Sequence, residues 1–128
     1  MSDFSDYSED KILNVLFRNQ SHTGAATIYA ALFTAAPTDA GGGTECSYSG
    51  YTREAIAFSA PSGGAIANSG TVTFDAAAGS SQTVVAIGIF DASTSGNLLA
   101  WKTLSSSITY NVGDIPIISA SGVTITAA

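Results

Sequence analysis

Residues 83–103 read TVVAIGIFDASTSGNLLAWKT, a pattern that predicts two β-strands joined by a polar turn. Side chains of a strand alternate between its faces, which predicts Val84, Ala86, Gly88 and Phe90 on one face and Val85, Ile87 and Ile89 on the other. A strand with two apolar faces belongs in the interior of a sheet. The segment from Asp91 to Asn97 favours chain reversal, and the second strand carries Trp101, the one tryptophan of the chain.

Other short apolar segments surround this hairpin. Thr27–Thr34 is apolar on both faces, which predicts a second interior strand. The remaining predicted strands are Tyr51–Phe58, Thr71–Phe74, Ile108–Val112 and a final run, Ile115–Thr126, that breaks near Ser119–Gly122 and places Pro116 at an edge or a strand start. No crossover helices separate these strands. The predicted class is therefore mainly β, a β-sandwich or jelly-roll-like domain of about seven or eight antiparallel strands over residues 25–128.

Residues 1–24 predict an N-terminal helical arm and a linker, with one α-helix within residues 1–19. Ser8 could cap this helix, or Asp6 and Glu9 could act as a capping-box analogue. Acidic residues crowd its first turn and Arg18 closes its last, which suits the helix dipole. The sequence therefore predicts where the helix lies and leaves its cap open.

An apolar stripe runs along this helix and consists of Ile12, Leu13, Leu16 and Phe17. A helix of about 11 residues is marginal alone in water, so the stripe needs a surface to cover it. One interpretation packs the stripe on the chain's own β-domain. The other docks it on a neighbouring subunit and makes these four residues partner-binding.

A loop of unusual length, Ala35–Gly50, follows the second predicted strand. Long loops in compact domains often contact a partner. We therefore expect a second partner contact here, at Asp39, Gly42 and Tyr48. A glycine-rich crossing between two sheets is the alternative interpretation.

The charge of the chain bounds its partners. Its 128 residues contain ten acidic and four basic residues, for a formal charge of −6. Without a basic patch, nucleic acid is not an expected partner. The N-terminus lacks the pattern of a secretory signal, and no apolar run is long enough to span a membrane. A single cysteine excludes an intramolecular disulfide.

Residues that could support catalysis are scattered. His22 lies in the linker without a supporting carboxylate. Cys46 has no basic neighbour to lower its pKa. Five carboxylates in separate turns are better explained by turn capping than by catalysis or calcium binding, namely Asp39, Glu45, Asp75, Asp91 and Asp114. Trp101 with Tyr48, Tyr51 and Tyr110 could stack on a sugar, although packing in the core or at an interface is the ordinary role of so few aromatics. We therefore expect no enzyme, no cofactor and no metal.

Four segments together resemble a family of small tailed-bacteriophage virion proteins: SEDKILNVLFRN (8–19), TIYAALFTAAPTDAGGGTECSYSGYTREAIAF (27–58), AIGIFDASTSGNLLAWKTL (86–104) and YNVGDIPIISASGVTIT (110–126). The resemblance covers nearly the whole chain. This sequence departs from the family pattern at Ile28, Ala30 and Cys46, which affects packing detail.

The resemblance implies a structural protein of a phage particle with no catalytic residues. The leading expectation is a capsid decoration or cement protein that stabilises the head. The alternative is a tail fibre or baseplate component involved in host attachment. The implied partners are other virion proteins (the major capsid protein or tail proteins) and further copies of the chain, in a homotrimer or another homo-oligomer. The implied location is the particle surface, after assembly in the host cytoplasm.

Overall fold

The computed structural model describes residues 3–127 and contains, within that range, one helix and nine strands. The ends of the predicted arm and domain at residues 1, 2 and 128 lie outside the described residues. In chain order the elements are α1 (Asp6–Arg18), β1 (Ile28–Ala35), β2 (Thr44–Glu45), β3 (Glu54–Ile56), β4 (Ala65–Ala67), β5 (Val72–Thr73), β6 (Gln82–Phe90), β7 (Leu98–Tyr110), β8 (Ile117–Ile118) and β9 (Thr124–Thr126). The predicted mainly β class with one N-terminal helix is confirmed.

The main sheet has five antiparallel strands. Its order is β2-β1-β6-β7, and β3 pairs with the other half of the same edge of β1. Gly88 of β6 lies between Ala31 of β1 and Trp101 of β7. Because β1 and β6 are paired on both sides, the interior positions predicted for both strands are confirmed, as is the hairpin.

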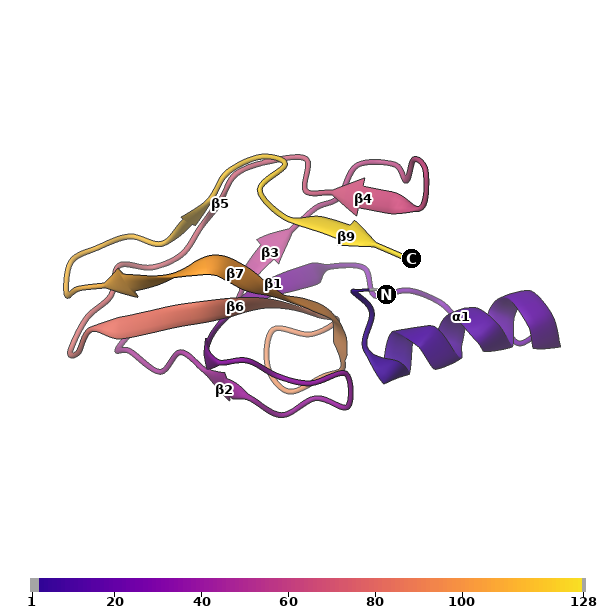
Figure 1. Cartoon of the computed structure of the whole chain (residues 1–128), viewed down its shortest axis with the longest axis horizontal. Helices are drawn as coiled ribbons and strands as arrows, with labels where there is room; N and C mark the ends of the chain where they lie inside the picture. The colour runs from indigo at the N-terminus through magenta and orange to yellow at the C-terminus, as the bar shows by residue number, and fades with distance from the viewer. Residues whose placement is uncertain (1–2, 128) are drawn as a thin grey trace.

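A second layer covers one face of this sheet (Figure 1). It consists of two antiparallel pairs, β4 with β9 and β5 with β8. Side chains of both layers form one buried cluster, which includes Leu32, Val84, Ile89 and Ala100 from the sheet and Val72, Phe74, Ile118, Val123 and Ile125 from the second layer. Burying such a side chain stabilises the fold by about 1.5–3 kcal/mol. The domain is therefore a sandwich with one continuous and one divided layer.

The hairpin departs from the predicted alternation at a bulge. Val84 pairs with Ile108, whereas Ala86 pairs with Thr103, so residues between Thr103 and Ile108 leave the ladder. As a result Val84 joins the inter-layer core, and Ala86 lies in the cluster on the opposite face. The prediction that these two side chains share a face is wrong, because an inserted bulge reverses the alternation.

Three strand predictions changed in detail. Ile108–Val112 is not a separate strand, because the bulge lets β7 continue from Leu98 to Tyr110. The short strands β2 and β4 were not predicted: β2 lies in the Ala35–Gly50 loop, and β4 lies between the predicted strands Tyr51–Phe58 and Thr71–Phe74. The final run does break at Ser119–Gly122, between β8 and β9, and Pro116 immediately precedes β8.

The face of the sheet opposite the second layer carries a smaller apolar cluster and an ion pair. Phe33 and Phe90 stack there with ring centroids 6.1 Å apart, and the Arg53 guanidinium lies 3.6 Å from the centre of the Phe90 ring. Two Arg53 nitrogens each lie 3.0 Å from a carboxylate oxygen of Glu45. Tyr51 donates to the same carboxylate at 2.6 Å. This bidentate network ties β2 to the chain before β3.

Candidate interaction surface

Helix α1 projects from one end of the β-body (Figure 1). Its N-cap is Ser5, whose side chain accepts a hydrogen bond from the Ser8 backbone nitrogen at 3.3 Å. The Ser5 hydroxyl also donates to the Leu98 carbonyl, and the Ser8 hydroxyl donates to the Leu99 carbonyl at 2.7 Å. The predicted caps, Ser8 or Asp6, are therefore wrong, because contacts with the start of β7 hold Ser5 in the capping position.

Helix α1 ends at Arg18, with Asn19 as its C-cap, and a linker follows. Asn19 has a left-handed φ of 54°, the conformation that commonly terminates helices. Residues 19–27 contain no helix or strand, and all of them are exposed. The arm is therefore attached to the body at its base, near Ser5, and through this linker.

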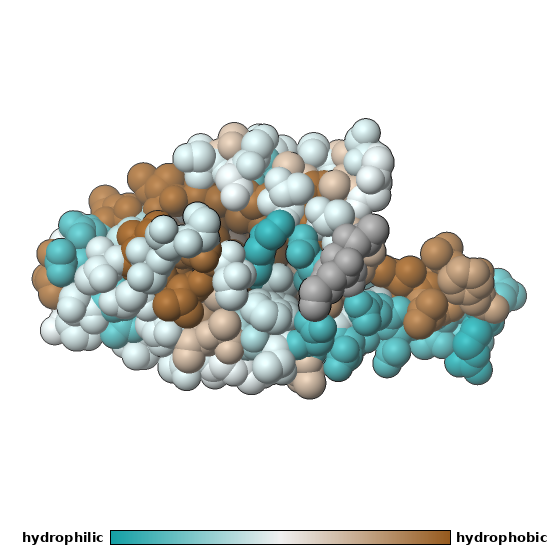
Figure 2. All heavy atoms as spheres, viewed as in Figure 1, coloured by the Kyte–Doolittle hydropathy of each residue, from teal (hydrophilic) through white to brown (hydrophobic). Residues whose placement is uncertain are grey.

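The β-body does not cover the apolar stripe of α1. No residue of the helix is buried, and the exposed fractions are 38% for Ile12, 41% for Val15, 53% for Leu13, 69% for Leu16 and 77% for Phe17. In Figure 2 apolar side chains gather on one side of the projecting helix and polar ones on the other. The interpretation that the stripe packs on its own domain is wrong. An exposed apolar patch of this kind marks an interaction surface, and docking on a neighbour stays a prediction.

An apolar hollow of about 290 Å³ lies between the base of α1 and the body. A second hollow of about 260 Å³ continues along the helix and shares Lys11, Ile12 and His22 with the first. We call the two together the arm groove, defined by Ile12, Val15 and Leu16 on the helix and by Ile28, Phe58 and Ile66 on the body. The body residues were not predicted, because they come from three separate segments. Val15 was also missed, although it lies one turn after Ile12.

Two residues of the long loop lie beside the base of the arm. Asp39 accepts a hydrogen bond from the Trp101 indole nitrogen at 2.9 Å, and its carbonyl accepts from the Asp6 backbone nitrogen at 2.9 Å. Asp39 and Gly42, together with Asp6 and Tyr7, line a hollow of about 280 Å³. The structure therefore brings two predicted contact residues next to the helix, and both are exposed.

Tyr48, the third predicted residue of this loop, lies in the core. Its side chain is 4% exposed, its hydroxyl donates to the Asp75 carbonyl at 2.7 Å, and its ring lies edge-on to Tyr51 at 5.4 Å. Burial raises the pKa of Tyr48 to about 12. Tyr48 therefore offers no side-chain surface to a partner, because the loop turns inward at this residue.

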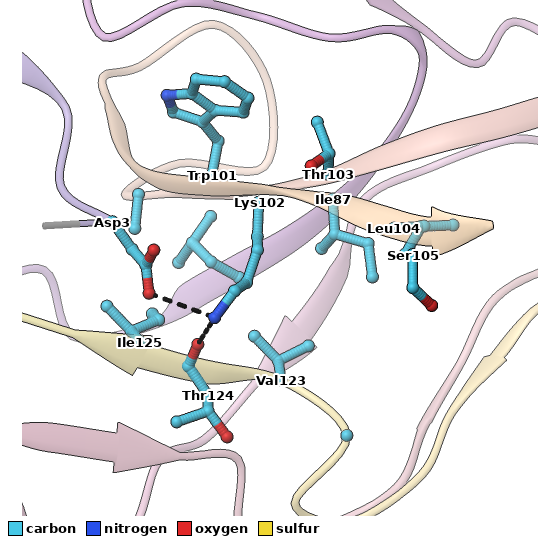
Figure 3. A pocket seen from close by; sticks show the side chains of 13 residues that line it. Asp3, Ile87, Trp101, Lys102, Thr103, Leu104, Ser105, Val123, Thr124 and Ile125 are labelled. Carbon is cyan, nitrogen blue, oxygen red and sulfur yellow. Dashed lines mark hydrogen bonds and ion pairs between the residues drawn. The ribbon is translucent and has the colours of Figure 1, made fainter. Parts of the chain in front are cut away.

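A further hollow of about 220 Å³ lies between β7 and β9. Ile87, Val123 and Ile125 line its apolar part (Figure 3). Across it, Lys102 donates from its ammonium to the Asp3 carboxylate at 3.4 Å and to the Thr124 carbonyl at 3.3 Å. The Asp3 carboxylate also accepts from the backbone nitrogen of Thr126 at 2.9 Å. These hydrogen bonds join the two layers at the point where the N-terminal segment contacts the body.

The candidate catalytic residues lack a supporting site. Cys46 is buried, and its burial together with the nearby Glu45 charge raises its pKa to about 11. A thiol in this state is a poor nucleophile. His22 is exposed in the linker, with its ring edge-on to Tyr7 at 6.5 Å. Within residues 3–127 no group of three or more His, Cys, Asp or Glu side chains could hold a metal ion.

Turn capping explains two of the five carboxylates. Asp91 accepts from the Asn97 backbone nitrogen at 2.7 Å, and Asp114 accepts from the Asn111 backbone nitrogen at 2.8 Å. Asp39 and Glu45 instead bond Trp101 and Arg53.

The tyrosines also depart from the sugar-stacking hypothesis. Tyr48 and Tyr51 pack with Phe74 in the core rather than beside Trp101. No stacking platform of these aromatics therefore forms on the surface.

A second exposed apolar patch was not predicted. It lies where β7 ends and the chain turns to β8, at the end of the body away from α1 (Figures 1 and 2). Its members are Ile108, Val112, Ile115 and Ile117, which are 45–62% exposed. The sequence predicts strands over these residues and does not indicate which of their side chains are exposed.

Among residues 3–127, α1 is too short and too polar to cross a membrane.

Comparison with known proteins places the chain in a family. The family model of the podophage GP4 fiber I protein gp80 matches residues 3–126. A search of curated proteins found no match. The expected kind of family, structural proteins of tailed-phage particles, is confirmed. Its description as a fibre protein agrees better with the tail-fibre alternative than with capsid decoration. The chain belongs to the family of the podophage GP4 fiber I protein gp80 and is a structural protein of a phage particle.

Proposed function

We propose that this chain is a non-enzymatic, homo-oligomeric component of a podophage tail fibre, held in the particle through the apolar face of α1. The observation that carries the proposal is the exposure of Leu13, Leu16 and Phe17 on a helix that projects from the body. Exposure of apolar side chains to water is unfavourable in free energy, and a partner that covers the helix removes this cost. In this reading the β-body is a rigid module and the arm is its attachment.

The family description favours a fibre over the head. The matched family is named for a fibre protein, and the match covers residues 3–126, which include both the arm and the body. The arm is therefore part of what the family shares. A cement protein on the capsid is the expectation that this description supports less well.

The chemistry of the side chains favours a structural role. The Cys46 thiol has a raised pKa and is buried. Asp91 and Asp114 are engaged in turns, and Arg53 and Glu45 neutralise each other. These groups hold the backbone rather than converge on a cavity, which is what a passive module requires.

Copy number and position in purified particles test the proposal. We expect quantitative mass spectrometry to find few copies per particle, and antibody labelling in electron micrographs to mark the tail. Phage that carry Phe17→Glu should yield particles depleted of this protein, while the soluble protein keeps its circular dichroism spectrum. Hundreds of copies spread over the head would refute the fibre assignment, and full incorporation of Phe17→Glu would refute attachment through α1.

A further inference from the structure

The apolar residues of α1 cover more of its circumference than one packing contact requires. At about 100° per residue, Val15 and Phe17 lie about 200° apart, and Ile12, Leu16 and Leu13 fill the arc between them. A helix that packs on a single surface typically carries an apolar stripe of at least about 100°. The arc on α1 therefore has room for two contacts.

The two edges of this arc have different surroundings. Ile12 and Val15 line the arm groove, beside body residues such as Ile28 and Phe58. Leu13 and Phe17 lie outside both hollows of the groove, and Phe17 is the most exposed apolar side chain of the helix at 77%. The edge of the arc at Val15 therefore borders the arm groove, whereas the edge at Phe17 projects into solvent.

We infer that the occupant of the arm groove is α1 of a second copy of this chain, with Leu13 and Phe17 of one copy entering the groove of the next. This inference rests on the proposed function, since it names the partner of the same helix. The donating edge, with Leu13 and Phe17, and the receiving edge, with Ile12 and Val15, consist of different residues. The contact is therefore heterologous, and it forms a closed ring when the rotation from one copy to the next returns to the first copy. Three copies are the fewest in which every helix has two different neighbours.

The charges beside the two edges agree with this arrangement. At about 100° per residue, Asp10 lies about 20° beyond Phe17, next to the donating edge. Lys11 lies beyond Val15 and lines both hollows of the groove. In a ring of parallel helices, Asp10 of one copy therefore faces Lys11 of its neighbour, at the rim of the contact. Opposite charges at such rims favour one orientation over its alternatives.

The exposed apolar area sets the size of each contact. The exposed fractions of the five apolar side chains correspond to roughly 500 Å² per helix, at the upper end of the apolar patches found on monomers. A standard interface buries about 800 Å² per partner. In the ring these five side chains serve two contacts, so each contact is smaller than this standard, and the assembly depends on closing all three.

Light scattering with size-exclusion chromatography of the full chain tests the inference. We expect a species of three copies. Phe17→Glu and Val15→Glu should each lower the association constant at least ten-fold, because each removes one edge. Val112→Glu is the matched comparison at the second apolar patch: it also replaces an exposed apolar residue, 62% accessible, but one that follows β7 at the end of the body away from α1 (Figure 1). It should associate like the unaltered chain. Circular dichroism verifies that each variant is folded.

Cysteine cross-linking tests which edges meet. Val15→Cys and Phe17→Cys in one chain should give covalent trimers on oxidation, because residues 15 and 17 of one helix point in opposite directions and can join only between copies. Either substitution alone should give no covalent dimer, since the native Cys46 is buried. Covalent dimers from Phe17→Cys alone would show a symmetric contact and overturn the ring.

Failure of this inference is distinguishable from failure of the proposed function. A purified chain that stays monomeric at every concentration overturns the inference, as does association that only Val112→Glu abolishes. If such a monomer still needs Phe17 to enter particles, attachment through α1 stands. If rings form in solution and particles contain no copies of the chain, the proposed function fails instead.

Discussion

The indole nitrogen of Trp101 donates a hydrogen bond to the Asp39 carboxylate at 2.9 Å, which joins the central hairpin to the loop after β1. The Asp39 carbonyl in turn accepts from the backbone nitrogen of Asp6, the first residue of α1. One loop residue therefore connects β7, the long loop and the arm. The direction in which the arm leaves the body depends on this loop.

Asp39→Ala should loosen this connection. Loss of one hydrogen bond of this type costs about 1 kcal/mol of the free energy of unfolding. Trp101 is the only tryptophan, so its fluorescence emission should shift as its indole nitrogen turns to water. Asp39→Asn keeps an acceptor oxygen, so its emission maximum and its free energy of unfolding should stay close to those of the unaltered chain. An unchanged emission maximum and unfolding midpoint in Asp39→Ala would contradict the assignment.

Glu45→Ala should be more costly than Asp39→Ala. The Arg53 side chain is 9% exposed and would lose its carboxylate partner. Tyr51 would lose the acceptor of its hydroxyl, which also accepts from the Leu32 backbone nitrogen at 3.0 Å. Breaking such a partly buried network should lower the free energy of unfolding by about 2–3 kcal/mol in urea titrations.

Tyr51→Phe is the second arm of this experiment. It should cost about 1–2 kcal/mol, because the Leu32 nitrogen loses its acceptor. The two substitutions remove the same hydrogen bond, so the double variant should be less destabilised than the sum of the single ones. Strict additivity would mean that Glu45 and Tyr51 act independently.

The long apolar strands were predictable because their burial follows from local sequence. β1 and β6 have two apolar faces, and only an interior strand satisfies both. The full length of β7 was not predictable, since Ser105, Ser106 and Ser107 separate the two predicted strands. The strand continues through them because a bulge accommodates residues that do not pair with β6. β2 and β4 are two and three residues long and exist through their pairing partners.

The helix side of the interaction surface was predictable in four of its residues, whereas its exposure was not. The spacing of Ile12, Leu13, Leu16 and Phe17 predicts an apolar stripe, but amphipathicity does not reveal what covers it. The choice of Ser5 over Ser8 as the cap depends on a hydrogen bond to Leu98, 93 residues away in the chain. Such contacts between distant segments are the part that local patterns do not contain.

Stability should fall at alkaline pH. Burial raises the pKa of Cys46 from 9.0 to about 11 and that of Tyr48 from 10.0 to about 12. For both groups the unfolded chain loses the proton at a lower pH than the folded chain does. Their contribution to the free energy of unfolding is therefore complete below about pH 9 and is lost as the pH rises through about 11 and 12. Urea midpoints measured from pH 7 to 12 should show this decline.

Cys46→Ala separates the contribution of the thiol. In this variant the decline between about pH 9 and 10 should be shallower than in the unaltered chain, because the thiol no longer titrates there. The folded unaltered protein should also resist iodoacetamide at pH 8 and react once unfolded in urea. Rapid alkylation of the folded protein would mean that Cys46 is accessible.

Gly88→Ala should destabilise the central sheet. A Cβ atom at this position would lie 2.6 Å from Cε1 of Phe33 and 3.2 Å from Cδ1 of Leu98. Relief requires Phe33 to move within a packed cluster, which costs about 1–3 kcal/mol. Gly70→Ala is the matched control, since no atom lies within 4 Å of its added Cβ, and it should change stability by less than about 0.5 kcal/mol. Equal effects of both substitutions would contradict the close packing.

Phe17→Ser and Leu32→Ser should separate the arm from the core. Phe17 is 77% exposed, so its replacement should leave the free energy of unfolding of the monomer within about 0.5 kcal/mol of the original value. Leu32 is 3% exposed and lies in the inter-layer core, where a polar replacement should cost at least about 3 kcal/mol. Urea titrations at low protein concentration, where association does not contribute, give both values. A loss above about 1.5 kcal/mol for Phe17→Ser would mean that the stripe packs on its own domain, and α1 would then have no free face for a partner.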